Sequence, residues 1–296
     1  MTFPDELSAE IAALIRTDEP LGPLLWLGIG GPAHYFSQPS TVDELKQVVS
    51  AANDAGLPVR VLGSGSNVLV RESGVDGLVI SLASLPGQEP TVDGSTMTAL
   101  AGTKLSTAVI ESVGAGLGGL EHLIGIPGTI GGAVVGNVSA GGRDIGSVVH
   151  KVTVLEKDGS LRVLGAEEVG FSHRKSSLTG LIVYSVTFSL EPRDAAELTK
   201  RMQKLWISRN STRPDEERRI AMPFIDPDSM PVRELIASVG LSGSREGEVS
   251  LDANRPSYMV AHPGATSDQC LKLIERVREQ VLLQTGIDLQ LNLQIW

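Results

Sequence analysis

The chain has 296 residues, a formal net charge of −10 and a pI of about 5.0. A nucleic-acid surface needs clustered Lys and Arg, so this net negative charge argues against one. It still allows a local basic pocket for a single anionic ligand. The length is sufficient for two domains. The single cysteine, Cys270, excludes an internal disulfide framework and lies in a helical pattern typical of a small core residue.

The first twenty residues are acidic and lack the charged-then-apolar order of a secretory signal. No uninterrupted apolar run reaches the roughly 18 residues that a membrane span needs. We therefore predict a cytoplasmic protein with no membrane or nucleic-acid partner and no metal site. The sequence carries no signal for an oligomeric state.

Hydrophobic periodicity and turn residues divide the chain into short helices and strands. Thr41, with Glu44 three residues later, predicts a capping box that opens a helix. Asp158-Gly159 between two apolar runs predicts a β-hairpin. The helices expected cover residues 8–16, 41–55, 106–114, 195–210, 231–239 and 268–284. The strands expected cover residues 59–62, 68–70, 78–82, 91–102, 148–155, 161–164, 181–190, 249–251, 258–260 and 289–295.

Many short strands with few intervening helices predict an α+β fold rather than a regular βαβ repeat. We expect a lead-in helix within residues 1–19 and a larger domain over residues 20–193. The larger domain should consist of two subdomains, at about residues 20–82 and 83–193. A smaller α+β domain is expected over residues 194–296.

Two glycine-rich stretches stand out against this pattern. Residues 125–142 (GIPGTIGGAVVGNVSAGG) contain seven glycines in eighteen positions, and residues 62–67 (LGSGSN) follow an apolar strand directly. Glycine is kept where φ is positive or where another group approaches the main chain. Small residues that leave a strand also expose successive N–H groups, which form a cradle for anionic oxygen. Neither stretch has the spacing of a standard nucleotide motif, but together they indicate a long, phosphate-bearing ligand.

Three segments carry a family resemblance: residues 58–70 (PVRVLGSGSNVLV), 118–133 (GGLEHLIGIPGTIGGA) and 171–176 (FSHRKS). They resemble the UDP-N-acetylenolpyruvoylglucosamine reductases, also called UDP-N-acetylmuramate dehydrogenases. The resemblance implies an FAD-binding domain of the vanillyl-alcohol-oxidase or PCMH type and a smaller C-terminal substrate domain. It implies non-covalent FAD, whose pyrophosphate would be held by Gly63, Ser64, Gly65, Ser66, Asn67, Gly125, Ile126, Pro127, Gly128, Gly131 and Gly132.

In that family NADPH reduces FAD, which then passes hydride to the enolpyruvyl double bond of a UDP-sugar in peptidoglycan precursor synthesis. The resemblance therefore implies a cytoplasmic oxidoreductase that acts on a CH–CH bond with NADP as acceptor. A serine supplies the proton, and a glutamate and the arginine of a YR-x-S motif stabilise negative charge. The arginine falls on Arg174, which is the implied catalytic residue, and the tyrosine falls on His173.

The C-terminal half departs from the family pattern at three positions. Phe224 and Pro227 fix a register in which the proton-donating serine becomes Met222 and a lysine becomes Ile225. The C-terminal glutamate becomes Asn292. A thioether carries no proton and cannot act as a general acid. Asp226 and Ser229, close to the lost serine, are the candidate replacement donors.

Each of these residues also has an ordinary structural interpretation. Arg174 would then be a surface ion-pair partner, and Met222 and Phe224 would be core residues beside a turn. The histidines His34, His122 and His173 would serve packing or hydrogen bonding.

Three functional hypotheses follow. The first is an active FAD-dependent, NADPH-linked reductase of the family with a rearranged proton donor. The second is an FAD-binding homologue that has lost this reaction and acts on another substrate or as a binding protein. The third is a structural relic without flavin, which the retained glycines disfavour.

Overall fold

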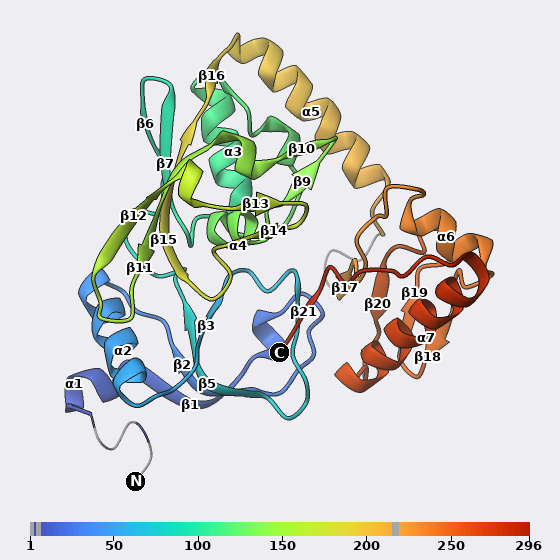
Figure 1. Cartoon of the computed structure of the whole chain (residues 1–296), viewed down its shortest axis with the longest axis horizontal. Helices are drawn as coiled ribbons and strands as arrows, with labels where there is room; N and C mark the ends of the chain where they lie inside the picture. The colour runs from blue at the N-terminus through green and yellow to red at the C-terminus, as the bar shows by residue number, and fades with distance from the viewer. Residues whose placement is uncertain (1–2, 4–6, 215–218) are drawn as a thin grey trace. The chain divides into compact units, whose positions relative to one another are not determined.

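The computed structural model describes residue 3, residues 7–214 and residues 219–296 (Figure 1). Its internal contacts group the chain into two compact units. Unit 1 comprises Met1–Thr17, Tyr35–Ser64 and Asp76–Ser211, and unit 2 comprises Asp18–His34, Gly65–Val75 and Thr212–Trp296. The chain therefore enters unit 2 three times, and the domain boundaries expected after residues 19 and 193 stay a prediction.

A four-stranded sheet runs through the N-terminal part of the chain. Its strand order is β1(Ile15–Pro20), β2(Pro32–Ser37), β5(Val75–Ser81) and β3(Val59–Leu62), with β3 and β5 parallel. Helix α2(Val42–Asp54) begins at the predicted place, because the Thr41 hydroxyl accepts the N–H of Glu44 at 3.1 Å. The predicted capping box is only half formed, since the Glu44 carboxylate accepts the N–H of Ser40 at 2.7 Å. The buried face of α2 packs with the buried residues of β5 in the core of unit 1.

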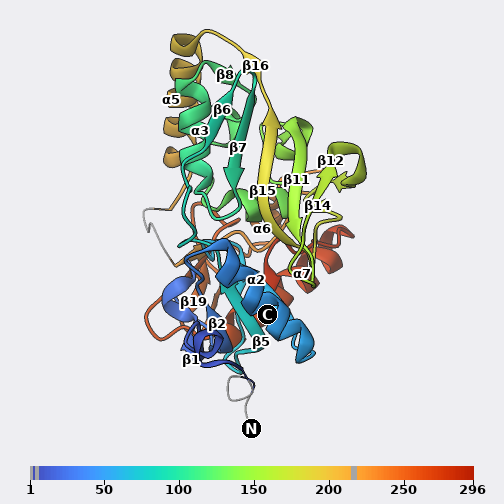
Figure 2. The ribbon, with the colours of Figure 1, turned by 90° about the vertical axis from the view of Figure 1, so that its left-hand side faces the viewer.

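The second sheet of unit 1 has five strands, all antiparallel to their neighbours. The predicted hairpin is confirmed as β11(Val149–Leu155) and β12(Leu161–Gly165), with Gly159 at φ +80° in the turn. Helices α3(Leu105–Gly114) and α5(Ala195–Ser211) contact each other and lie side by side in Figure 2. The remaining strands of this sheet are β15(Ile182–Ser189), β7(Thr96–Leu100) and β6(Thr91–Asp93).

Shorter elements connect these parts of the chain. The helical ones are α1(Ala9–Ala12), η2(Gly22–Leu24), η3(Glu121–Leu123), α4(Ile130–Val135), η4(Ile145–Val148) and η5(Ala166–Glu168). The strand pairs are β8(Leu117–Gly118) with β16(Glu191–Pro192), β9(Ser139–Ala140) with β10(Arg143–Asp144), and β13(Phe171–Ser172) with β14(Lys175–Ser176).

The described residues of unit 2 form a four-stranded antiparallel sheet and two α-helices around their own apolar core. Helix α7(Ser267–Thr285) has a capping box between Thr266 and Gln269 and ends at Gly286, which is left-handed at φ +73°. The strands in spatial order are β17(Ile220–Ala221), β20(Met259–Ala261), β19(Val249–Leu251) and β18(Arg245–Glu246). The other elements are α6(Val232–Ser238) and the parallel pair β21(Gln294–Ile295) with β4(Val68–Leu69).

Three expected elements differ from the structure. The lead-in helix covers only Ala9–Ala12, because Ile15 enters β1 and is buried in the unit 1 core. The strand expected at residues 91–102 is a hairpin, β6 and β7, which turns at Gly94 with φ +57°. The strand expected at residues 289–295 is regular only at Gln294–Ile295.

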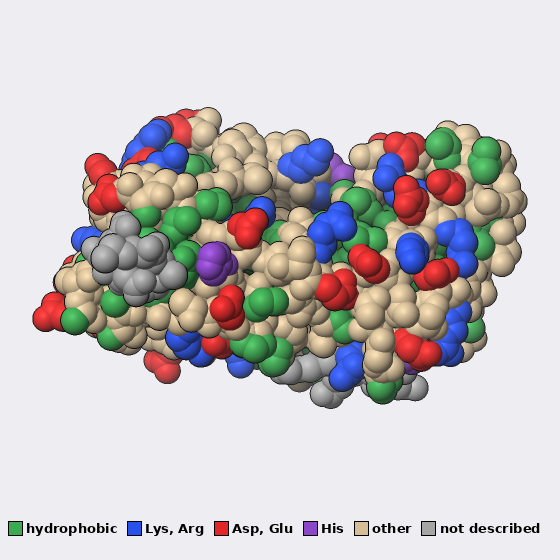
Figure 3. All heavy atoms as spheres, turned by 90° about the horizontal axis from the view of Figure 1, so that it is seen from below, with side chains coloured by type: hydrophobic (Ala, Val, Ile, Leu, Met, Phe, Trp, Pro, Cys, Tyr) green, Lys and Arg blue, Asp and Glu red, His purple; other side chains and the backbone are tan. Residues whose placement is uncertain are grey.

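The surface mixes both signs of charge: on the face in Figure 3, basic and acidic side chains are interspersed. Among the described residues, no helix is long and apolar enough to cross a bilayer.

The five-stranded sheet yields a stability prediction. Phe188 in β15 is fully buried, so Phe188→Ala removes a whole ring from the core and should lower the free energy of unfolding by about 3–5 kcal/mol. Val163→Ala in β12 of the same sheet is the control, since Val163 is 56% exposed. Urea denaturation measures both, and equal midpoints for the two variants would contradict this core assignment.

Candidate cofactor site

The two glycine-rich loops meet in unit 1 at Gly63 and Thr129. A methyl group placed on Gly63 would lie 2.7 Å from the Thr129 hydroxyl oxygen, so only glycine allows this approach. The same hydroxyl accepts the N–H of Gly132 at 3.4 Å and caps α4. The sequence had separated these loops by more than sixty positions, and the fold joins them.

Four backbone N–H groups at this junction donate no hydrogen bond to another described residue. They belong to Gly63 and Ser64 on one loop and to Gly128 and Thr129 on the other. Successive main-chain N–H groups that are not used by the protein itself are typical of sites for anionic oxygen. These four donors in two adjoining loops are therefore the candidate anion-binding site of unit 1. We call these four residues the amide cradle.

Side chains and backbone angles around the amide cradle agree with this assignment. The Ser64 hydroxyl oxygen is buried and has no hydrogen-bond partner among the described residues. Gly128 has φ +153° and Gly125 has φ +77°, both in regions that favour glycine. A methyl group on Gly132 would meet only the Thr129 hydroxyl, at 3.5 Å, so the protein itself leaves room there.

Other predicted contact residues serve the packing of the chain. Gly65 belongs to unit 2, where a methyl group would lie 2.4 Å from the Leu24 carbonyl oxygen. Gly131 allows its backbone to approach Ala101, whose Cβ would be 2.8 Å from a methyl group. Glycine is needed at these two positions because another segment of the chain lies against the backbone.

The remaining predicted residues differ in exposure and bonding. Ile126 is half-buried against the unit 1 core and donates its N–H to the Leu123 carbonyl at 3.1 Å, whereas Pro127 is exposed. Ser66 lies in unit 2 and is half-buried. The Asn67 side chain is engaged with Asn292, also in unit 2, and is described with that cluster below.

Arg174 lies at the tip of the β13–β14 hairpin with φ +57°, a left-handed conformation that is uncommon outside glycine. The hairpin is anchored to the end of the second glycine stretch. The Ser176 hydroxyl donates to the Val135 carbonyl at 2.8 Å, and the Asn137 amide donates to the Ser172 carbonyl at 2.8 Å. A strained backbone held by such contacts is typical of a functional position.

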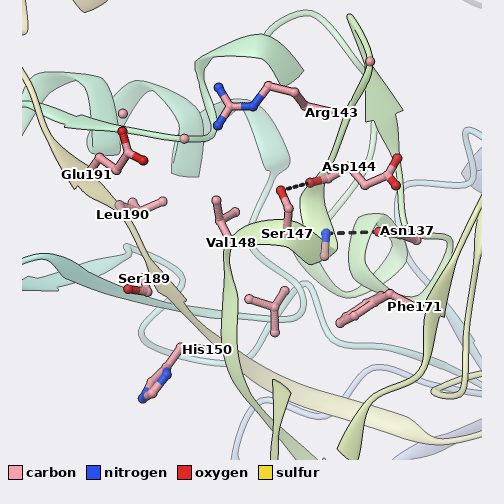
Figure 4. Close-up of a pocket in the computed structure, with 15 residues that line it drawn as sticks. Asn137, Arg143, Asp144, Ser147, Val148, His150, Phe171, Ser189, Leu190 and Glu191 are labelled. Carbon is pink, nitrogen blue, oxygen red and sulfur yellow. Dashed lines mark hydrogen bonds between the residues drawn. The ribbon is translucent and has the colours of Figure 1, made fainter. Parts of the chain in front are cut away.

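A cavity of about 790 Å³ opens in unit 1 beside this hairpin (Figure 4). Asn137 forms part of its wall and accepts the Gly146 N–H at 3.0 Å. Its walls include Arg143 as well as the carboxylates of Asp144 and Glu191, with His150 beside them. No residue of the amide cradle lines it, so the cavity is separate from the cradle, and its mixed charge does not favour a diphosphate.

Glu121 is a buried charge next to the second glycine loop. Its side chain is 2% exposed, accepts the Gly119 N–H at 2.7 Å and pairs with Arg201 at 3.4 Å. Burial raises the pKa of this carboxyl, but the backbone hydrogen bonds and Arg201 outweigh it, so the pKa lies below its ordinary value. The neighbouring His122 is also buried, and burial, with Arg143 nearby, lowers the pKa of its imidazole.

In unit 2 the structure brings together Met222, Asn292 and Asn67. The Asn292 amide donates to the Met222 carbonyl at 3.0 Å and to the Asn67 side-chain oxygen at 3.3 Å. The Asn67 amide in turn donates to the Asn292 carbonyl at 2.7 Å. Phe224 and Leu291 form a β-bridge beside them. The two positions that carry serine and glutamate in the family motifs are therefore neighbours here and joined by neutral hydrogen bonds.

The two candidate replacement donors have different surroundings. Asp226 accepts the N–H of Val232 at the start of α6 at 2.8 Å, which is a structural contact, and Ser229 is exposed. Cys270 is fully buried in α7, and burial raises the pKa of its thiol to about 12. Across residues 7–214 and 219–296, no three His, Cys, Asp or Glu side chains are placed to hold a metal ion.

Comparisons with known proteins agree with this geometry. Residues 33–165 match the family model for an FAD binding domain, and residues 213–296 match that for the UDP-N-acetylenolpyruvoylglucosamine reductase C-terminal domain. The UDP-N-acetylenolpyruvoylglucosamine reductase of Rhodopirellula baltica is 58% identical over 99% of this chain and 95% of its own length. This chain belongs to the UDP-N-acetylenolpyruvoylglucosamine reductase family.

More distant members of the reductase family match over similar lengths. The enzyme of Moorella thermoacetica is 35% identical over 98% of this chain and 96% of its own length. The crystal structure of the Thermus caldophilus reductase (MurB) matches with a TM-score of 0.81 and 34% identity, covering 95% of this chain and 99% of that one. The predicted fold class, an FAD-binding domain followed by a smaller C-terminal domain, is confirmed.

The chain thus carries the FAD-binding domain of the reductase family, and the N–H donors of the amide cradle are of the kind that binds a pyrophosphate. Sequence reasoning missed Thr129 and Asn137 in this region. Thr129 was the one hydroxyl among the glycines at the start of α4, a capping signal. Asn137 has φ +39°, a conformation for which asparagine is enriched, but no short motif marked it.

The Gly63–Thr129 junction gives a direct test of FAD binding. Gly63→Ala would press a methyl group against the Thr129 hydroxyl and shift one loop against the other. We expect FAD affinity to fall about tenfold or more, measured by flavin fluorescence. Gly114→Ala at the end of α3 is the control, because nothing lies within 4 Å of its added methyl group. Equal affinity of the two variants would contradict the junction.

The neutral cluster of unit 2 gives a second prediction. In Asn292→Asp, a carboxylate oxygen would face the Met222 carbonyl and the Asn67 oxygen, which are both acceptors. We expect a loss of about 1 kcal/mol in the free energy of unfolding at pH 7. The two neighbouring acceptor oxygens should raise the pKa of the new carboxyl. When the pH falls through that pKa, the protonated carboxyl can donate a hydrogen bond again, and the loss in the free energy of unfolding should become smaller.

Denaturation of Asn292→Asp at pH 7 and pH 4 measures this effect. Asn254→Asp, at an exposed position of unit 2, is the matched control. If the loss in the free energy of unfolding is the same at both pH values, the hydrogen bonds donated by the Asn292 amide do not stabilise the cluster.

Proposed function

We propose that this chain reduces UDP-N-acetylglucosamine enolpyruvate with FAD held in the amide cradle and NADPH as the electron donor. Membership of the reductase family supports the reaction. The single structural observation that carries the proposal is the set of four N–H groups at the Gly63–Thr129 junction that have no acceptor among the residues that the structure describes. Two loops that converge with free donors suit the two adjacent phosphates of FAD.

In this proposal, different residues of unit 1 bind the cofactor and stabilise charge on the substrate. The amide cradle and the buried Ser64 hydroxyl bind the diphosphate, and Gly132 leaves the space that the cofactor needs. When bound, FAD supplies the hydride chemistry. Arg174, held at the tip of its hairpin, stabilises negative charge that develops on the substrate.

The reaction also needs a proton, on the carbon next to the one that receives hydride. Its donor must be a group other than the family serine, which this chain lacks. Met222 has no exchangeable proton, and the Asn292 amide is already engaged by two oxygens of the protein. Asp226 in turn is engaged at the start of α6. We therefore place proton delivery outside the Met222–Asn292 cluster.

The alternative that the chain has lost the family reaction is not supported. The Rhodopirellula baltica relative, 58% identical over 99% of this chain, carries the reductase name. The flavin-free relic is likewise disfavoured, because the match to an FAD binding domain covers residues 33–165.

A reoxidation experiment tests the proposed reaction. NADPH should bleach the flavin absorbance of the purified protein, and UDP-N-acetylglucosamine enolpyruvate should restore it without oxygen. Bleached flavin that stays reduced after the UDP-sugar is added would contradict the proposed substrate.

The same assay tests Arg174. Arg174→Ala should slow substrate-triggered reoxidation about 100-fold, while flavin content stays at the wild-type level. Lys175→Ala is the control, because Lys175 is the exposed neighbour in the same hairpin. Equal rates for the two variants would remove Arg174 from the site.

A further inference from the structure

Helix α5 makes few apolar contacts for its length. Of its seventeen residues only Leu198 is buried, while Trp206 is 49% and Ile207 is 61% exposed. Met202 and Leu205 pack against the unit 1 core as partly buried residues. Apolar burial alone therefore gives a weak account of why this helix lies where it does.

Two arginines of α5 contact the segment that precedes the second glycine loop. Arg201 pairs with the buried Glu121 carboxylate at 3.4 Å. Two turns later, the Arg209 guanidinium donates to the carbonyl of His122 at 3.1 Å and to the carbonyl of Ile124. Both residues that supply these carbonyls are buried. A planar guanidinium presents several N–H donors in a fixed fork, so it holds two carbonyl oxygens in a more defined geometry than the single nitrogen of an ammonium group does.

The Arg209 contacts lie where the chain turns into the cofactor loop. Gly125 follows Ile124 directly and is left-handed at φ +77°. A methyl group on Gly125 would lie 3.4 Å from Arg209 Cδ and 3.8 Å from Trp206 Cδ1. Three residues further on are Gly128 and Thr129, which supply half of the amide cradle. The guanidinium thus fixes the direction in which this loop leaves η3.

We propose that Arg209 is a positioning residue for FAD: by holding the His122 and Ile124 carbonyls, it sets the place of the Gly128 and Thr129 N–H groups. The inference rests on the proposed binding of FAD in the amide cradle. It gives α5 a role in cofactor retention that does not require contact with the flavin. Preorganised donors bind an anion without the cost of ordering the loop on binding.

The test compares Arg209→Ala, Arg209→Lys and the control Lys204→Ala, which removes the same charge from an exposed position of α5. FAD release from the holoenzyme is followed by flavin fluorescence after dilution. We expect release about tenfold faster in Arg209→Ala, an intermediate rate in Arg209→Lys, and the wild-type rate in Lys204→Ala. Release at the wild-type rate from both Arg209 variants would overturn the inference.

A second readout needs neither activity nor bound flavin. Backbone amide exchange in the flavin-free protein should be about tenfold faster at Ile126, whose N–H donates to the Leu123 carbonyl at 3.1 Å, in the Arg209 variants, with the melting temperature of Arg209→Lys close to that of wild type. Unchanged exchange at Ile126 would overturn the inference even if FAD release changed. Wild-type protein that binds no FAD would instead refute the proposed function, and the exchange result would still decide the role of Arg209.

Discussion

The structure depends on one close approach, that of the Gly63 backbone to the Thr129 hydroxyl. A side chain larger than hydrogen at position 63 would separate the two loops, and the amide cradle takes donors from both of them. The surrounding elements maintain this contact: β3 delivers Gly63 from the first sheet, and α4, capped by Thr129, packs against the second. We therefore attribute the proposed binding of the anionic cofactor to the spacing of the two loops rather than to clustered positive side chains.

Much of this could be predicted from local sequence. Thr41 marks the start of α2, Asp158-Gly159 marks the β11–β12 hairpin, and apolar periodicity gives α5 and α7 to within two residues. These signals are local, because caps and turns are formed by residues a few positions apart. The α+β class follows from the same signals, and the flavin-binding half was implied by the resemblance of the glycine motifs to the reductase family.

What escaped prediction depends on residues far apart in sequence. In the sequence, Gly65 and Gly131 cannot be told apart from Gly63. In the structure, the room beside them is taken by Leu24 and Ala101, so no ligand is needed to explain these two glycines. Helix α5 belongs to the flavin unit, where Met202 and Leu205 pack against the core and Arg209 reaches two carbonyls more than eighty residues away. Asn292 is a further example. From the sequence it is only a position where the family glutamate is missing, whereas in the structure it forms neutral hydrogen bonds with Asn67, 225 residues away.

The most direct measurement is backbone amide exchange at Gly63, Ser64, Gly128 and Thr129 with and without FAD. If these N–H groups hold the pyrophosphate, all four should exchange rapidly in the flavin-free protein and become protected together when FAD is added. Protection elsewhere in unit 1, with these four amides unchanged by FAD, would contradict the account.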